Sequence, residues 1–297
     1  MLSDFLQFTT SGLTTGAIYG LLALGWVLVM RVSGLLYFIQ GEFVVIGVFV
    51  IVVLQEHGWA TWIGGLAAIA TCVVLALAVD GLVMRRLRHP TPMSEVLVLL
   101  GLALLFGLAL QNIAGPNARL MRGFLPTKPI EFFGAFVTPH QILAVAVGAV
   151  TTLLVWVAIT KTSFGQAMQA CADNVEGALL VGIKPMRLRT LGFVGAACIG
   201  GVAAIVIGPL AAVEPLGGLL LGIKGFIAAV VAKWTFLGAV AAGVLIGLLE
   251  NYGAGYISSV YKDVISLGLL VVVLLVQGAV AGDSSMGMRI RLRLAAR

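Results

Sequence analysis

Residues Thr160–Thr190 read TKTSFGQAMQACADNVEGALLVGIKPMRLRT, a polar stretch that separates two long apolar runs. It contains two capping patterns, one beginning at Ser163 and one at Asp173, each with Gln or Glu three residues later. Apolar residues at helical spacing follow each pattern, so we predict two short amphipathic helices. Gly182 is placed for a left-handed helix end, and Pro185 follows it as a stop. A simple connection would need neither caps nor apolar stripes, so we expect another molecule to dock on this segment.

The rest of the chain has the composition of a membrane protein. Of its 297 residues, 61% are hydrophobic and 10% are charged, whereas soluble domains are about half apolar and about a quarter charged. Its mean hydropathy is +1.12. The apolar runs reach the ~20 residues that a helix needs to cross a bilayer, and they do not alternate as barrel strands do. We therefore predict an all-α, polytopic transmembrane bundle, with residues 1–297 as a single domain.

The net charge of +6 is concentrated beside the ends of the apolar runs. Basic residues cluster in 85–90, 161–189 and 289–297, and such clusters mark the cytoplasmic side of a membrane. This topological role accounts for the charge, so we expect no binding of nucleic acid. With these segments inside, the runs give eight or nine spans, an N-terminus outside and a C-terminus in the cytoplasm. Residues 160–190 then form a cytoplasmic loop, and 114–138 an extracytoplasmic one.

Glycines at four-residue spacing favour close packing between helices, because they let two backbones approach each other. Gly12, Gly16 and Gly20 form such a stripe in the first apolar run. Gly243 and Gly247 form a shorter one in a late run. We interpret both stripes as helix-packing surfaces.

Polar groups interrupt the apolar run from Leu35 to Leu54, where they are costly at membrane depth. They include Tyr37, Gln40 and Glu42. Such groups either line a cavity or make structural hydrogen bonds, and both interpretations remain open. The Gly-rich stretch 214–226 is a second piece of non-ideal helix, of the kind that transporters place beside a substrate. These two regions are the candidate substrate path.

The sequence contains no recognisable catalytic constellation. It has no GxxxxGK[ST] phosphate-binding loop, no Gly-x-Ser-x-Gly elbow, and no His, Cys or carboxylate residues at metal-ligand spacing. We therefore expect no catalytic residue, metal or cofactor in this chain. Asp80 lies about one turn before a basic cluster, and we expect it to pair with Arg85.

Three further stretches form a set that runs in one order through nearly the whole chain. They read GAIYGLLALG at 16–25, GQAMQA at 165–170 and GIKGF at 222–226. As a set they resemble the integral-membrane permease subunit of branched-chain amino acid ABC importers. The resemblance covers roughly residues 12–275.

This resemblance implies a machine of several subunits in the bacterial inner membrane. Two related permease subunits form the pore, two cytoplasmic ATPase subunits bind ATP and Mg²⁺ and drive it, and a periplasmic binding protein delivers the substrate. Glu176-Gly177-Ala178 with Gly182 resembles the start of the loop that ABC importers insert into the ATPase. The implied coupling residues are Gly165, Ala170, Asp173, Glu176, Ala178, Leu179 and Gly182. The implied substrate path contains Tyr37, Phe38, Gln40, Glu42, Lys224 and Phe226.

Three stretches depart from the family's pattern, at 37–41, 232–236 and 277–282. The first replaces Asn-Phe-Ala-His-Gly with Tyr-Phe-Ile-Gln-Gly in the expected translocation region. The resemblance therefore implies an ABC importer more firmly than it implies which solute is transported. Relatives also transport other small polar solutes. The resemblance leaves open whether the pore is a homodimer or a heterodimer. The alternative is a self-sufficient secondary transporter or channel, in which Glu42 or Asp80 would carry a proton or cation.

Overall fold

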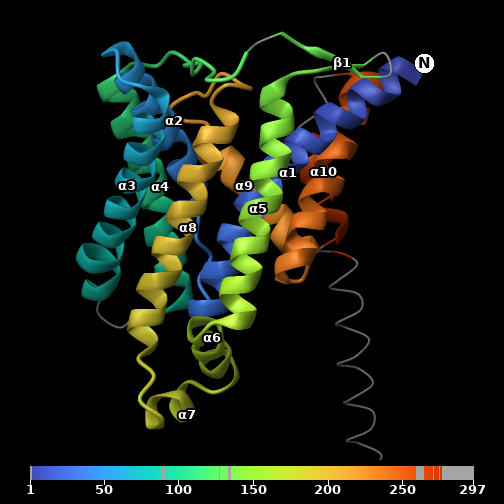
Figure 1. The fold of residues 1–297 in the computed structure, drawn as a ribbon. Coiled ribbons are helices and arrows are strands. Elements are labelled where there is room, and N and C mark those ends of the chain that lie inside the picture. The colour runs from blue at the N-terminus through green and yellow to red at the C-terminus, as the bar shows by residue number, and fades with distance from the viewer. Residues whose placement is uncertain are drawn as a thin grey trace, which may run out of the picture.

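Helices make up most of the regular structure in the computed structural model, which describes residues 2–87, 91–126, 128–132, 135–258, 264–269, 271–273 and 275 (Figure 1). In chain order the elements are α1 (Leu2–Ser33), α2 (Gln40–Glu56), α3 (Thr61–Ala78), a π-helical turn η1 (Val79–Val83), a 3-10 turn η2 (Met84–Arg86), α4 (Pro92–Ala114), β1 (Ile130–Phe132), β2 (Ala135–Val137), α5 (Pro139–Lys161), α6 (Ser163–Asp173), α7 (Val175–Leu180), α8 (Pro185–Ile207), α9 (Gly218–Val231) and α10 (Phe236–Tyr256).

Within those residues, six helices are long and apolar enough to cross a membrane: Ser3–Ser33, Thr61–Arg86, Met93–Ala114, Pro139–Lys161, Pro185–Ile207 and Phe236–Tyr256. The chain is thus a multi-pass membrane protein. Two other runs that the sequence suggested as spans are shorter helices, α2 with 17 residues and α9 with 14. The last run, 264–280, lies partly outside the described residues, and 277–282 and 289–297 lie wholly outside them. The count of eight or nine spans stays a prediction.

The all-α prediction missed a small hairpin between α4 and α5. Strands β1 and β2 pair in antiparallel register, with Ile130 opposite Val137 and Phe132 opposite Ala135. In the same region, Arg119 forms a β-bridge with Val213, the residue that follows the end of α8 by six positions. The predicted outer loop therefore contains regular structure of its own.

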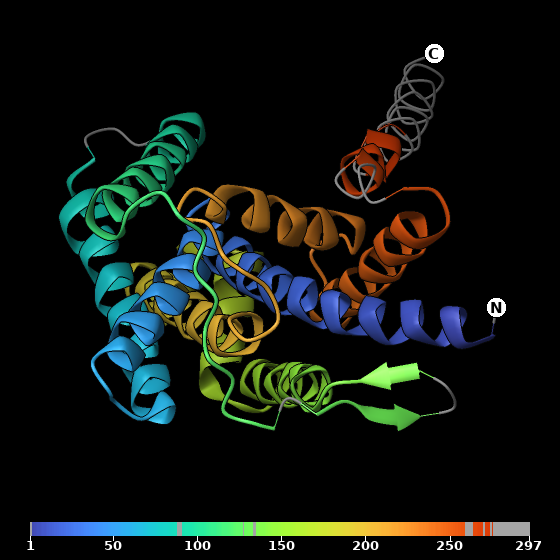
Figure 2. The same ribbon diagram turned by 90° about the horizontal axis from the view of Figure 1, so that it is seen from above.

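Helix α1 is the central column of the bundle. Most of it is buried, and side chains such as Trp26 and Leu22 have no exposed surface, whereas α4 and α5 leave most of their surface uncovered. Viewed from above, α3 and α4 lie on the side of the bundle away from the N-terminus and α10 (Figure 2). The core is therefore built around α1, with α4 and α5 at the periphery.

The glycine stripe of α1 lies directly against α10. A Cβ atom added at Gly16 would lie 2.5 Å from Cα of Val244, and one added at Gly247 would lie 2.3 Å from the amide nitrogen of Gly16. Gly12 and Gly20 contact Leu248 and Val240 in the same way. Because these contacts reach backbone atoms, any side chain at Gly16 or Gly247 would push the two helices apart.

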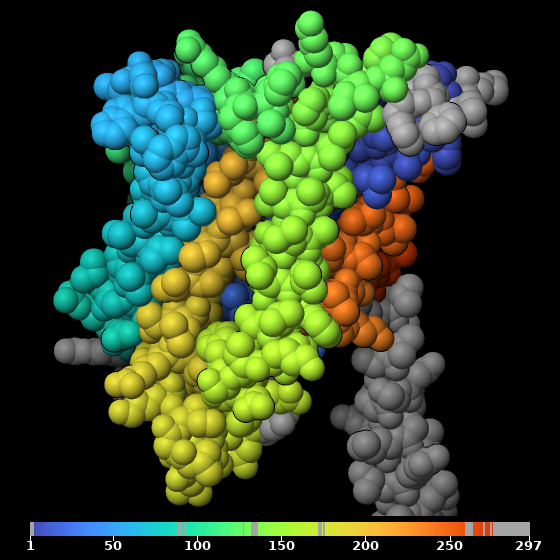
Figure 3. Space-filling view, viewed as in Figure 1, coloured from blue at the N-terminus to red at the C-terminus, as the bar shows by residue number. Residues whose placement is uncertain are grey.

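The two ends of the bundle differ in character. The start of α1, the hairpin and the residues between α4 and α5 lie at one end, and α6 and α7 lie at the opposite end (Figure 1). In the space-filling view, α6 and α7 protrude beyond the ends of α5 and α8 (Figure 3). This protrusion coincides with the segment 160–190. We call α6, α7 and the turn that follows them the platform.

Candidate functional site

The platform contains the two short helices that the sequence predicts, but both predicted caps are wrong. Helix α6 begins at Ser163 itself, after Thr162, and no side chain caps it. Helix α7 is capped by Asn174, whose Oδ1 accepts a hydrogen bond from the amide of Gly177 at 3.0 Å. Asp173 is instead the last residue of α6. Asn and Asp are equally good caps, and the extended backbone at position 174 decides between them.

The end of α7 is fixed by Gly182, which adopts the left-handed φ of +83° that the sequence predicts. The amide of Gly182 donates to the carbonyl of Leu179, and that of Ile183 donates to Ala178, each at 3.0 Å. These two bonds form a Schellman motif, in which glycine avoids the cost of a Cβ atom at positive φ. The turn is therefore sharply defined.

A small core makes the platform a folded unit. Cys171 of α6, Ala178 of α7 and Leu188 of α8 are buried together, and Val32 at the end of α1 packs against them. Gly165 seats α6 on α5, because a Cβ atom there would lie 1.7 Å from the carbonyl oxygen of Ile159. A displacement of the platform would therefore be passed to α1, α5 and α8.

The tip of the platform is apolar and exposed. Leu179, Leu180 and Val181 are 54%, 90% and 75% exposed. These three residues belong to the platform, which protrudes in Figure 3, and they lie between Glu176 and Gly182 in the sequence. A contiguous apolar tip rimmed by polar residues is typical of a protein–protein contact. Docking of another molecule on this segment, which the sequence suggested, stays a prediction.

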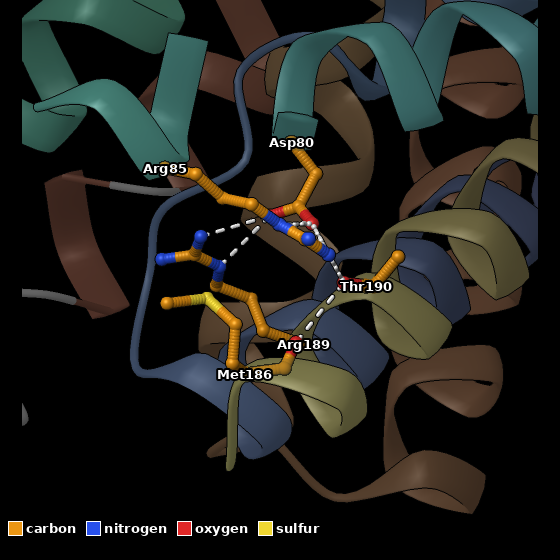
Figure 4. Close-up of polar contacts among 5 residues, drawn as sticks. All are labelled: Asp80, Arg85, Met186, Arg189 and Thr190. Atoms are coloured by element: carbon orange, nitrogen blue, oxygen red, sulfur yellow. Dashed lines mark hydrogen bonds and ion pairs between the residues drawn. The ribbon is translucent and has the colours of Figure 1, made fainter. Parts of the chain in front are cut away.

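Asp80 joins the end of α3 to the base of α8, as Figure 4 shows. Its carboxylate, 1% exposed, contacts Nη2 of Arg85 at 3.0 Å and Nη2 of Arg189 at 2.9 Å, and accepts a hydrogen bond from the hydroxyl of Thr190 at 2.6 Å. The pairing with Arg85 that the sequence predicts is confirmed. The contacts with Arg189 and Thr190 were missed, because they lie more than 100 residues away in the sequence.

The polar residues after α1 lie deep in the bundle. Tyr37 is fully buried, packs against Phe193 with 4.4 Å between ring centroids and the ring planes tilted by 39°, and its hydroxyl has no hydrogen-bond partner among the described residues. Gln40 donates to the carbonyl of Ala196 at 3.1 Å and crosses the backbone of Gly25. Both residues therefore connect the start of α2, and the short non-helical segment between α1 and α2, to α8.

An aromatic cluster joins the same break to α9. The ring of Phe38 lies 5.2 Å from that of Trp26 and 6.2 Å from that of Phe226. Trp26 donates its indole N–H to the carbonyl of Gly222 at 2.9 Å. Of the residues proposed for the substrate path, the structure thus brings Phe38 and Phe226 together.

Glu42 lies at the N-terminus of α9. Its carboxylate is 2% exposed and accepts a hydrogen bond from the amide of Leu219, and its Oε2 has no partner in the described part of the chain. The backbones are in contact here, since a Cβ atom at Gly41 would lie 1.8 Å from the carbonyl oxygen of Gly218. A helix N-terminus stabilises a negative charge, so Glu42 is suited to hold the two short helices α2 and α9 together.

Lys224 points elsewhere, into a buried ionic triad. Its Nζ lies 3.2 Å from Oε1 of Glu250 and 3.1 Å from the hydroxyl of Tyr19, which in turn donates to Oε2 of Glu250 at 2.7 Å. Lys224 is 7% exposed and Glu250 is fully buried. The only sequence signal for this triad was the presence of opposite charges in two apolar runs, which did not say that they meet.

Residues 8–274 match the family model described as the permease component of branched-chain amino acid transport systems. This chain belongs to that family. The permease protein LivH of the high-affinity branched-chain amino acid transport system of Escherichia coli is 32% identical over 289 residues, which cover 92% of this chain and 93% of LivH. BraD, the permease protein of the corresponding system of Pseudomonas aeruginosa, is 29% identical and covers 91% of this chain and 93% of BraD.

The fold of this permease-family chain is also found in a solved structure. PsaBC from Streptococcus pneumoniae, in complex with a Fab, aligns with a TM-score of 0.53 at 11% identity, over 92% of this chain and 95% of that chain. Family membership makes this chain a transport component rather than an enzyme. In the described residues, no three His, Cys, Asp or Glu side chains gather as a metal site would require.

Proposed function

We propose that this chain is a permease subunit of an ABC importer and forms half of its translocation pathway. The cargo is branched-chain or related amino acids, or similar small polar solutes. One observation carries the proposal: a chain of this family bears a folded platform with an exposed apolar tip at one end of a multi-pass bundle. The names of LivH and BraD support the substrate class.

The proposed complex has the composition that the family resemblance implies. Two cytoplasmic ATPase subunits bind ATP and Mg²⁺, so this chain needs no cofactor of its own. A second permease subunit, identical or homologous, supplies the other half of the pore, and an extracytoplasmic binding protein delivers the solute. The membrane is the bacterial inner membrane.

The proposed orientation has the platform in the cytoplasm and the N-terminus outside. Lys161, Lys184 and Arg187 lie at the platform end, as the positive-inside rule requires. Residues 114–138, at the opposite end, then form the extracytoplasmic loop. Nine spans result when α2, α9 and the helix beginning at 264 are counted with the six longer helices, and eight result if one of the short runs is re-entrant.

Coupling to the ATPase is assigned to the platform. Leu179 and its exposed neighbours enter the ATPase surface, with Glu176 beside them. Ala178, Gly165 and Gly182 keep the platform rigid through the small core, the contact with α5 and the Schellman turn. Asp173 and Ala170 lie on the last turns of α6. A rigid platform passes the movement of the ATPase to α1 and α8 without bending.

The experiment compares two matched substitutions at opposite ends of the molecule. Leu180→Glu alters the platform tip, and Leu120→Glu, at a position 60% exposed, alters the other end. Tagged protein is purified from its native membrane, and ATP-driven uptake of leucine is measured after reconstitution. We expect an ATPase and a second permease to co-purify with wild type and with Leu120→Glu, and ATPase recovery to fall at least tenfold with Leu180→Glu.

Two outcomes would overturn the proposal. If no ATPase accompanies the wild-type protein, the chain is not part of an ABC importer, and transport driven by an ion gradient becomes the explanation to test. If Leu180→Glu keeps wild-type uptake, the platform is not the coupling surface. Asp80 gives no support to the alternative in which it carries a proton or cation. Its carboxylate already pairs with two arginines and accepts a hydrogen bond from a threonine.

A further inference from the structure

A cavity of about 350 Å³ lies between α1, α5, α8 and α9 and reaches the ionic triad. Lys224 and Tyr19 form part of its lining. The volume falls at the lower end of the ~300–1,000 Å³ that is usual for small-molecule sites. The cavity is therefore large enough for one small solute at membrane depth.

The walls of this cavity differ in chemistry. Three residues with hydroxyl groups, Ser11, Thr14 and Thr15, line the side formed by α1. Ile207 of α8 and Leu221 of α9 contribute aliphatic surface. A solute with one polar end and one branched aliphatic end would satisfy both sides, because a buried polar group requires a hydrogen-bond partner and an aliphatic group does not.

A larger cavity of about 640 Å³ cannot serve the same solute. It lies beside α2 and α3, and Trp62, Leu66 and Ile69 are typical of its lining, in which none of the described residues is ionisable. A charged end placed there would lose its hydration without gaining a counter-charge. The smaller cavity is thus the better candidate for a charged solute.

We propose that the smaller cavity binds an amino acid, with the carboxylate on the ammonium of Lys224 and the aliphatic side chain against Ile207 and Leu221. The proposal rests on the function proposed above and adds a binding site within this chain. Glu250 is not among the residues that line the cavity, and it acts as a positioning residue that orients the ammonium of Lys224 through their 3.2 Å contact. A charge-assisted hydrogen bond is strong in such a buried site. The ammonium of Lys224 has three N–H donors, so it can donate to a solute carboxylate while it keeps its contact with Glu250.

The alternative role for the triad is a structural tie between α1, α9 and α10, and the two roles predict different results for one double variant. Replacing a buried ion pair by apolar residues of similar size is often neutral for stability. Lys224→Met combined with Glu250→Met should therefore fold. If the triad only held helices together, the double variant would still transport.

The first measurement is uptake of leucine by the complete importer in proteoliposomes. We expect the double variant to elute from size-exclusion chromatography as wild type does, with its partners, and to lose at least tenfold in uptake rate. Uptake at the wild-type rate would overturn the proposal. If the double variant fails to assemble, the labelling measurement below decides with Lys224 and Glu250 intact.

The second measurement reports occupancy of the cavity directly. Ser11→Cys, in a background in which Cys72, Cys171 and Cys198 are replaced by alanine, is labelled with a membrane-impermeant methanethiosulfonate. We expect saturating leucine to slow labelling at least fivefold, and leucinamide, which lacks the carboxylate, to leave the rate unchanged. Leu120→Cys, outside the cavity at the same end, is the control and should show no protection.

The outcomes separate this proposal from the function on which it rests. Leucine uptake by the wild-type importer without protection of Ser11→Cys would overturn the binding site and leave the importer intact. Equal protection by leucine and leucinamide would overturn the role of Lys224 as the carboxylate partner. Absence of uptake by the wild-type complex would overturn the importer function itself.

Discussion

Asp80 and Arg189, 109 positions apart in the sequence, form an ion pair with 2.9 Å between Oδ1 and Nη2. The aspartate belongs to a π-helical turn at the end of α3, and the arginine belongs to the first turns of α8, directly after the platform. π-helical turns like the one that holds Asp80 are frequent at functional sites. The pair therefore links a movement of the platform to α3 by a second route, besides the packing of α8 itself.

Asp80→Asn should destabilise the protein strongly, because Arg189, only 14% exposed, would lose its counter-charge. Breaking a buried ion pair costs about 3–5 kcal/mol. The matched variant Arg85→Gln should cost less than about 1 kcal/mol, because Arg85 is 47% exposed. Denaturant unfolding in detergent measures both. Equal loss of stability in the two variants would show that burial does not set the strength of this cluster.

Gly16→Leu should prevent α1 from seating against α10. Its side chain would meet the backbone of Val244, which cannot move aside as a side chain can, so the cost should exceed the ~1–3 kcal/mol usual for overpacking. Gly101→Leu, on α4, is the control, because no other described part of the chain lies within 4 Å of a Cβ atom added at that position. The fraction of monodisperse protein after purification is the readout. A monodisperse Gly16→Leu variant would contradict the packing.

Gly182→Ala should weaken coupling while leaving the membrane bundle intact. A left-handed backbone costs a residue with a Cβ atom about 1–2 kcal/mol. Gly182→Asn should restore much of the function, because asparagine tolerates this conformation. The number of ATP molecules hydrolysed per solute transported measures the effect. The prediction fails if alanine and asparagine behave alike.

Asn174→Ala should expose the amide of Gly177, whereas Asp173→Ala should leave that amide bonded. Loss of an N-cap costs about 1 kcal/mol, which corresponds to roughly a fivefold faster hydrogen exchange. Exchange of peptides covering residues 175–181 gives the comparison. Faster hydrogen exchange in the Asp173 variant alone would contradict the Asn174 cap and show that Asp173 caps α7, as the sequence predicted.

Much of the fold follows from local patterns. The long apolar runs predict membrane-crossing helices, and the glycine at 182 predicts a left-handed turn that the structure confirms. The cap of α7 could not be predicted from a local pattern. Asp173 and Asn174 are both good capping residues, and only the backbone conformation selects Asn174. The hairpin was missed because its strands have three residues each, too few to show alternation.

The candidate site depends on contacts that no local pattern contains. The sequence places Lys224 in an apolar run and Glu250 at the end of another, but the meeting of both with Tyr19 depends on how α1, α9 and α10 pack. In the same way, Asp80 was expected to contact its neighbour Arg85, and its contact with Arg189 required the position of α8. Long-range pairing, rather than residue type, is what a single sequence leaves open.

The packing of α1 against α10 has a consequence for biosynthesis. Tyr19 and Glu250 are separated by 231 positions, so at about 5–20 residues per second the ribosome needs roughly 12–46 s to make the partner of α1 after α1 itself. During that interval the glycine face of α1 has no α10 to cover it. The central column of the bundle is thus completed near the end of translation, and substitutions in α10 should act as assembly defects, cleared by membrane proteases, before they act as transport defects.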